Sequence, residues 1–192
     1  LATAAAGSTT RINGSLEQPA GGVLQLRVDH ARGRMDAIEA TGPVQLRGRL
    51  QPSLVNAGAI KPGTVSLGSF LRAGGGADVA GLTLGNTAMM TFALRERDGA
   101  VGLTSTADFA PAGLHVDAGR LGTLLARGQS EGLPHFRNLT AELVKIPSVE
   151  QLGHAYWRVS GAAATALAQV GAESGTAFTR LLSRRGGPAH GE

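Results

Sequence analysis

The sequence of 192 residues predicts a mainly β fold followed by an α-helical C-terminal segment, and three observations support this. Up to about Gly113, apolar and polar residues alternate with a period of two, which is typical of strands with one buried face. Glycine accounts for 29 residues, many of them in turn signals between these strands. Beyond Leu114 the apolar spacing changes to three and four. A chain that is first all-β and then all-α usually has two structural units, so we expect a β domain at 1–113 and a helical segment at 114–192.

Three stretches of the first part alternate most clearly, at 24–28, 44–50 and 90–95. Their apolar positions are Leu24, Leu26 and Val28, then Val44, Leu46 and Leu50, then Met90, Phe92 and Leu94. Turn signals separate the strands: Asn13–Gly14, Gly21–Gly22, Gly33, Gly42–Pro43, Lys61–Pro62–Gly63, Gly74–Gly75–Gly76, Gly85–Asn86 and Asp98–Gly99. The strands recur at a spacing of roughly 8–14 residues, which leaves no room for helical crossovers and favours a sandwich, a barrel or a β-solenoid.

The β part itself divides into two sections. Short strands resembling the rungs of a solenoid continue to about Gln51, and a longer, hairpin-like section runs from Thr64 to about Ala107. No strict repeat is visible in either section.

The second part predicts about three helices. Leucines at 121, 124 and 125 fall on one helical face, and Leu133, Phe136, Leu139 and Leu143 recur at three or four residues. After Pro147, Ser148 and Gln151 form a capping box that opens the next helix. The clearest helical spacing follows at 162–183, through Leu167, Val170, Ser174, Phe178 and Leu181, and it ends at cations and then Gly and Pro.

Composition excludes several classes of protein. The net charge is +4, but basic and acidic residues are interspersed in both parts, which disfavours a nucleic-acid partner. No run approaches the roughly 20 apolar residues of a membrane-spanning helix. Cysteine is absent, which suits a chain that crosses a membrane unfolded. Only 4% of the residues are aromatic, so burial must depend on aliphatic side chains.

Residues that could carry catalysis lack the required contexts. None of the five histidines has a partner at i, i+4, and no cysteine can complete a zinc site. Asp29–His30 lies at a predicted turn and is interpreted as solvated rather than as a catalytic dyad. Asp36 and Glu39 point to opposite faces at strand spacing, which excludes an acid–base pair. Tyr156 and Trp157 are interpreted as packing anchors. We therefore expect no catalytic, metal or cofactor site.

Several motifs together resemble a known family. The stretch 34–50 has an Asp, alternating apolar residues, a Gly and then a strand closed by Gly-x-Leu, and so resembles the late passenger of pertactin-like autotransporters. Segments 13–16 and 22–29 are similar to the two strands that come before it, and 61–67 resembles the turn into the autochaperone cap. A second match, to the helical linker before the translocator barrel, rests on Ile146–Pro147–Ser148, Leu152, Ala155, Ser160–Gly161, Leu167, Phe178 and Leu182.

This resemblance implies a fold and a role. Residues 1–113 would form the end of a right-handed parallel β-helix with a hairpin-rich autochaperone cap, and 114–192 would lead to a translocator barrel outside this chain. The implied function is non-catalytic: the region nucleates folding of the passenger at the cell surface and links it to the outer membrane. The implied partners are the upstream β-helix and the downstream barrel, with outer-membrane assembly machinery and periplasmic chaperones during transit through the periplasm.

The residues expected to carry this role are core positions rather than a chemical site. They form the predicted folding core: Leu24, Leu26, Ile38, Val44, Leu46, Leu50, Leu67, Phe70, Phe92 and Leu94. Two alternatives stay open. An adhesive module that recognises a host glycan or protein would need an exposed aromatic or charged groove, which the few aromatics disfavour. A fragment of a secreted hydrolase would need a nucleophile–base pair, which the sequence does not provide.

Overall fold

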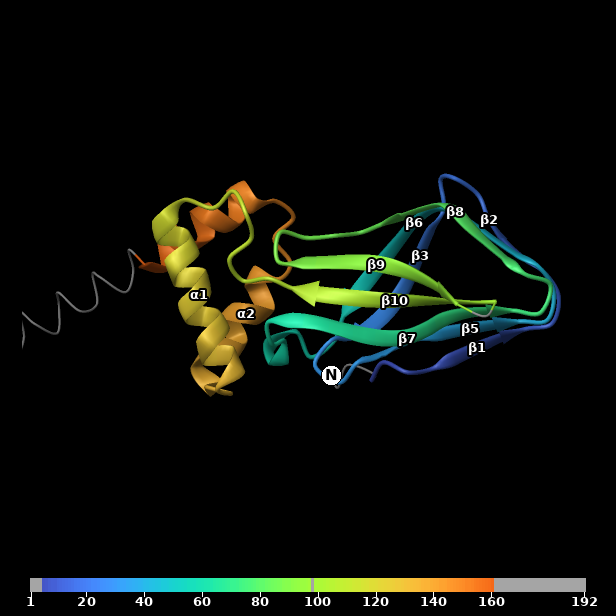
Figure 1. Ribbon diagram of the computed structural model, residues 1–192, viewed down its shortest axis with the longest axis horizontal. Helices are drawn as coiled ribbons and strands as arrows, with labels where there is room; N and C mark the ends of the chain where they lie inside the picture. Colours follow the sequence, from blue (N-terminus) through green and yellow to red (C-terminus); the bar gives the residue numbers. More distant parts are fainter. Residues whose placement is uncertain (1–4, 98, 161–192) are drawn as a thin grey trace, which may run out of the picture. The chain divides into compact units, whose positions relative to one another are not determined.

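The computed structural model describes residues 5–97 and 99–160. In this part of the chain the fold is mainly β, with helices towards its C-terminal end, which confirms the predicted class (Figure 1). The elements are β1 (Thr9–Ile12), β2 (Leu16–Gln18), β3 (Val23–Asp29), β4 (Arg34–Met35), β5 (Ala37–Ala40), β6 (Val44–Leu54), η1 (Ala57–Ala59), β7 (Gly63–Ala73), β8 (Ala77–Leu84), β9 (Met90–Arg97), β10 (Ala100–Ala107), α1 (Val116–Ser130), η2 (Pro134–Phe136) and α2 (Arg137–Leu143). A further helix begins at 149 and continues to 160.

The first sheet combines parallel and antiparallel pairing. Its order is β1-β5-β7-β10-β9, and β1, β5 and the end of β7 are parallel to one another. The strands β7, β10 and β9 are antiparallel neighbours, with β9 and β10 joined as a hairpin. Within the section 64–107 that the sequence predicts to be hairpin-like, β9 and β10 form a hairpin, whereas β8 pairs in parallel with β6 in the second sheet.

The second sheet is built around the long strand β6. Both β2 and β3 pair with β6 in parallel on one side, and β8 pairs with it in parallel on the other. The short strand β4 adds an antiparallel edge to β3. Parallel neighbours need a connection that runs back before the next strand begins. Here that connection is a strand of the other sheet: β7, in the first sheet, lies between β6 and β8, which are parallel neighbours in the second.

The two sheets therefore share three successive levels, which we call tiers. The first tier is β1, β2 and β3, the second is β5 and β6, and the third is the end of β7 with β8. The turns 13–15, 41–43 and 74–76 join the sheets within each tier and lie above one another; we call these turns the corner. In Figure 1 the corner lies at the end of the sheets opposite to α1 and α2.

The helices α1 and α2 belong to the same compact unit as the sheets. Contacts divide the chain into one unit at Leu1–Gly153 and another at His154–Glu192. The change from strands to helices falls between β10 and α1, near the expected position at 113, but it is not the border between the compact units. None of the described helices is long and apolar enough to cross a membrane.

The helix that begins at 149 starts as predicted. The Gln151 amide donates to the Ser148 hydroxyl over 3.3 Å, and the Leu152 amide donates to the Ser148 carbonyl over 3.0 Å. Ser148 is thus its N-cap. Of the two aromatic residues predicted to be packing anchors, Tyr156 is buried whereas Trp157 is 74% exposed, so that interpretation is wrong for Trp157. The predicted helix at 162–183, and with it Leu167, Phe178 and Leu182, lies outside the described residues.

Candidate functional site

The predicted folding core is largely buried. Eight of its ten positions are buried: Leu26, Ile38, Val44, Leu46, Leu50, Leu67, Phe70 and Phe92. Leu24 and Leu94 are half-buried, so the expectation of full burial is wrong for these two. Leu24 lies near the start of β3 and Leu94 in the middle of β9, which pairs with β10.

Backbone hydrogen bonds tie the three tiers together at the corner. The Gly42 amide donates to the Gly14 carbonyl over 2.9 Å, and the Gly75 amide donates to the Gly42 carbonyl over 3.2 Å. The Leu16 amide donates to the Pro43 carbonyl, and the Val44 amide to the Gly76 carbonyl. Each turn of the corner therefore satisfies backbone groups of the next one, which these bends would otherwise leave unpaired.

Glycine is required at the corner because the tiers approach each other through their backbones. A β-carbon at Gly75 would lie 2.5 Å from the Pro43 nitrogen, and one at Gly74 would lie 2.5 Å from the Thr41 carbonyl oxygen. A β-carbon at Gly42 would lie 2.8 Å from the Gly14 carbonyl carbon. The glycines that read as turn signals in the sequence thus serve a second purpose, which is close stacking of one tier on the next.

Asp36 fastens the first tier to the second. Its carboxylate accepts hydrogen bonds from the amides of Gly7 and Ser8 at 3.0 and 2.9 Å. It also forms an ion pair with the Arg27 guanidinium, with 2.7 Å between Nε and Oδ2. Burial raises the pKa of Asp36, but the hydrogen bonds from Arg27 and from the backbone amides lower it more, from 3.8 to about 2. The ionised form is therefore the one that the folded state stabilises.

We expect Asp36→Asn to lower the free energy of unfolding by roughly 2 kcal/mol at neutral pH, because about two pKa units separate the folded and unfolded carboxyl. A lowered pKa means that this contribution is complete above the ordinary value of 3.8 and is lost as the pH falls towards about 2. Urea titrations at several pH values measure the difference. The matched control is Glu39→Gln, whose ion pair with Arg11 is exposed, and which should change stability by less than about 1 kcal/mol. An equal loss in both variants would contradict the assignment.

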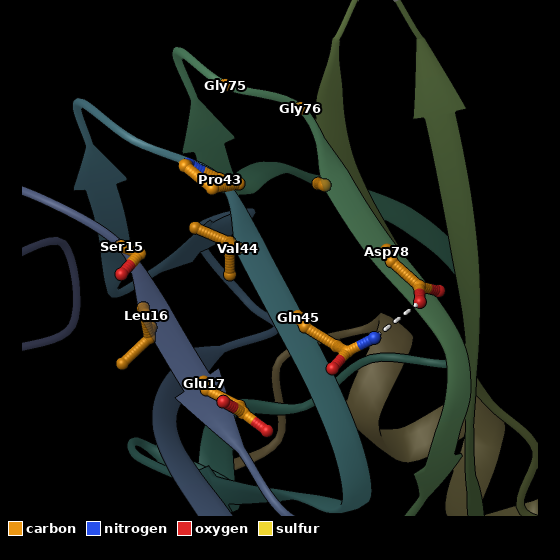
Figure 2. A pocket seen from close by; sticks show the side chains of 10 residues that line it. Ser15, Leu16, Glu17, Pro43, Val44, Gln45, Gly75, Gly76 and Asp78 are labelled. Atoms are coloured by element: carbon orange, nitrogen blue, oxygen red, sulfur yellow. Dashed lines mark hydrogen bonds between the residues drawn. The ribbon is translucent and has the colours of Figure 1, made fainter.

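A groove lies beside the corner. It has a volume of about 470 Å³ and is lined by β2, β6, β8 and the turns before them: Ser15, Leu16, Glu17, Pro43, Val44, Gln45, Gly75, Gly76, Ala77 and Asp78. Figure 2 shows Gln45 directed towards Asp78, with a hydrogen bond of 3.1 Å from the amide to the carboxylate. This bond and that from the Ala80 amide lower the pKa of Asp78. The groove is acidic and has no aromatic side chain in its lining, so it lacks the stacking surface that sugar recognition favours.

A buried polar cluster occupies the place where the sequence predicted a solvated turn, and that prediction is wrong. Asp29 and His30 are each only 2% exposed. The Asp29 carboxylate accepts hydrogen bonds from the Arg32 guanidinium at 3.1 Å and the Asn56 amide at 2.6 Å. His30 Nε2 lies 3.1 Å from the Lys61 carbonyl oxygen, and Nδ1 lies 2.7 Å from the hydroxyl of Ser105, which is also buried.

This cluster does not have the geometry of a hydrolase. The His30 ring nitrogen that faces a carbonyl oxygen must donate, so Nδ1 of the neutral ring accepts from the Ser105 hydroxyl. The Asp29 carboxylate, which would have to orient the imidazole in a catalytic triad, is instead bound by Arg32 and Asn56. The Ser105 hydroxyl is fully covered, whereas a nucleophile must reach its substrate.

The helices α1 and α2 contact each other and the short helix η1 through a buried amide and a close backbone approach. The Gln129 side chain, 3% exposed, donates to the Thr140 hydroxyl and to the Gly58 carbonyl, at 2.5 and 3.4 Å. A β-carbon at Gly58 would lie 2.6 Å from the Arg137 carbonyl oxygen. The contact between η1 and α2 therefore requires a glycine.

The features described above, which are the corner, the Asp36 ion pair and the contact between η1 and α2, join segments that are distant in the chain. Within 5–97 and 99–160, no three His, Asp or Glu side chains are grouped so that they could hold a metal ion. Comparison with protein-family models, with curated proteins and with solved structures finds no match to this chain.

Proposed function

We propose that this chain is a non-catalytic folding and secretion module of a pertactin-like autotransporter, acting as the cap on which the passenger β-helix forms. The finer fold is then the end of a right-handed parallel β-helix with a hairpin-rich autochaperone section. Its partners are the upstream passenger and the downstream translocator barrel, with assembly factors of the outer membrane and periplasm during export. The module works at the surface of a Gram-negative cell and needs no cofactor.

The observation that carries this proposal is the parallel pairing of successive strands at similar chain separations in both sheets. Arg11 pairs with Glu39 across β1 and β5, 28 residues apart, and Leu16 pairs with Val44 across β2 and β6 at the same separation. From the second tier to the third the separation becomes 33, as between Gln45 and Asp78. These separations, together with 26 residues between Val23 on β3 and Arg49 on β6, support a stack of tiers like that of a solenoid.

The two ends of this stack differ in a way that suits a folding cap. Among the described strands, β1 and β2 of the first tier each pair with a single strand, in the second tier, and a β-carbon at Gly14 would meet no atom within 4 Å. At the other end the first sheet continues into the antiparallel pair β10 and β9. The outer strand β9 carries Arg95, Glu96 and Arg97 as exposed residues. Charged residues on an edge strand oppose further pairing, so addition of strands to the first sheet is favoured at β1 rather than at β9.

The direct test measures secretion of the whole protein that carries this chain, expressed with its flanking sequences in a Gram-negative host. Leu46→Ala and Phe92→Ala should each reduce the amount of folded, protease-resistant passenger at the cell surface several-fold. Both side chains are buried, at 1% and 7% exposure, and truncating them costs on the order of 2–5 kcal/mol.

The matched control is Leu124→Ala, which removes the same atoms from a side chain that is 57% exposed on α1. It should be secreted at the wild-type level. Secretion of the Leu46 variant at the wild-type level would contradict the proposal. Binding to a glycan array that is lost on substituting Glu17 and Asp78 in the acidic groove would instead favour the adhesive alternative.

A further inference from the structure

We propose that His30 is a pH-sensitive latch that holds β10, and with it the β9–β10 hairpin, against the first tier. This inference depends on the fold and not on the proposed role in secretion. The geometry joins three segments that are distant in the chain. His30 follows β3 at the end of the first tier, Lys61 precedes β7, and Ser105 lies on β10, 75 residues after His30.

A neutral imidazole satisfies both hydrogen bonds of the latch and also gives the Ser105 hydroxyl proton an acceptor. Nε2 donates to the Lys61 carbonyl, and Nδ1 accepts from the Ser105 hydroxyl at 2.7 Å. A protonated ring would donate at both nitrogens, so the hydroxyl would have to turn and direct its own proton elsewhere. Since both side chains are buried, water cannot take that proton as long as β10 stays in place. Protonation therefore favours movement of β10 away from the ring.

The charged groups near the ring offset a positive charge only in part. Asp29 is adjacent in sequence, but its carboxylate is engaged by Arg32 and Asn56. The Lys61 ammonium is directed to the Ser130 carbonyl of α1, at 3.4 Å. Of the strands around the ring, β10 has no charged residue, and β7 has Arg72 alone, near its far end; β3 and β4 contribute Arg27, paired with Asp36, and Arg34.

Burial is the main cause that lowers the pKa of His30, and it outweighs the opposing effects of the Lys61 carbonyl and Asp29. The sign follows directly. Because the pKa of His30 is lowered while β10 covers the ring, the imidazole binds a proton more readily once β10 has moved away. The contribution of His30 to holding β10 in place is therefore complete above the ordinary pKa of 6.5 and weakens as the pH falls below it. This window is separate from that of Asp36, which titrates near 2.

Hydrogen exchange of the intact chain tests the latch. After correction for intrinsic exchange rates, protection of the β10 amides should fall by up to about fivefold between about pH 6.5 and pH 5.5. Amides of β5 and β6 should change much less over the same range, because the corner and the tiers do not depend on the ring. The fall should be reversed on return to neutral pH.

Two variants and one titration make the result decisive. His30→Asn keeps an oxygen that can accept from Ser105 but cannot titrate, so it should abolish the pH response of β10. His115→Asn is the control, because this histidine is exposed at the start of α1 and should leave the response intact. In the wild-type chain, NMR titration of the His30 ring should give a pKa below its ordinary value of 6.5.

The proposal is overturned if β10 protection does not change with pH, if it changes equally in His30→Asn, or if all strands lose protection together. A pKa of His30 at or above its ordinary value would overturn it even if the variant failed to fold.

Discussion

Phe70→Ala is expected to lower the free energy of unfolding by about 3–5 kcal/mol, the range found when a fully buried phenylalanine is truncated. Phe70 has no exposed surface and lies on β7. This strand is parallel to β5 and antiparallel to β10, so it joins the stacked tiers to the hairpin section. A loss of this size is a large part of the stability of a small domain. Urea denaturation followed by circular dichroism measures it.

The matched control for Phe70 is Leu94→Ala on β9. Leu94 belongs to the same predicted folding core, but it is only half-buried, and it should cost clearly less than Phe70→Ala. Val23→Ala, at a side chain 62% exposed on β3, should be nearly neutral. If the three variants lost similar amounts of stability, burial in this core would not be what holds the fold together.

The strands and turns could be predicted from the sequence because their signals are local. Alternation at 24–28, 44–50 and 90–95 corresponds to β3, β6 and β9, and the glycine clusters fall at the turns. The pairing could not be predicted in the same way. The partner of a strand residue lies 28 or 33 residues away and is selected by the contacts at the corner. The alternation of apolar residues, whether at a period of two or at spacings of three and four, carries no information on this pairing.

The helices illustrate a different limit. Their spacing predicts one buried face for Leu121, Leu124 and Leu125, but Leu125 is buried and Leu124 is exposed. The face that packs is set by Gly122 against the Phe109 backbone and by Gly128 against the Phe136 ring. Glycine carries no hydrophobic signal, so a pattern of leucines cannot reveal a face that depends on close approach.

The polar residues are the hardest to predict. Asp29 and His30 have the composition of a turn, and the chain does turn directly after them. Their burial depends on Asn56 and Ser105, which are 27 and 75 residues away. In the sequence, Asp36 is the acidic residue of the motif at 34–50 and, at strand spacing from Glu39, no catalytic acid. Its structural role depends on amides near the N-terminus of the described chain.

Gly75→Ala is expected to destabilise the fold by about 3 kcal/mol, at or above the usual range for overpacking, because the new β-carbon would meet backbone rather than a flexible side chain. The nearest atoms are the Pro43 nitrogen at 2.5 Å and its Cδ at 2.7 Å. Neither can move without displacing the second tier. Gly21→Ala is the control, since a β-carbon there would meet nothing within 4 Å and the backbone needs no positive φ.

The position of the damage distinguishes the stacked corner from general loss of stability. Gly75→Ala separates the third tier from the second, so hydrogen exchange should accelerate first at the Gly75 and Val44 amides, which bond across that junction. Gly42→Ala separates the second tier from the first and should instead expose the Gly42 and Leu16 amides. If the tiers form a nearest-neighbour stack, each substitution opens its own junction before the rest of the chain unfolds. Uniform acceleration in both variants would mean that the sheets unfold as one cooperative block, and the tiers would then not be units that could template one another.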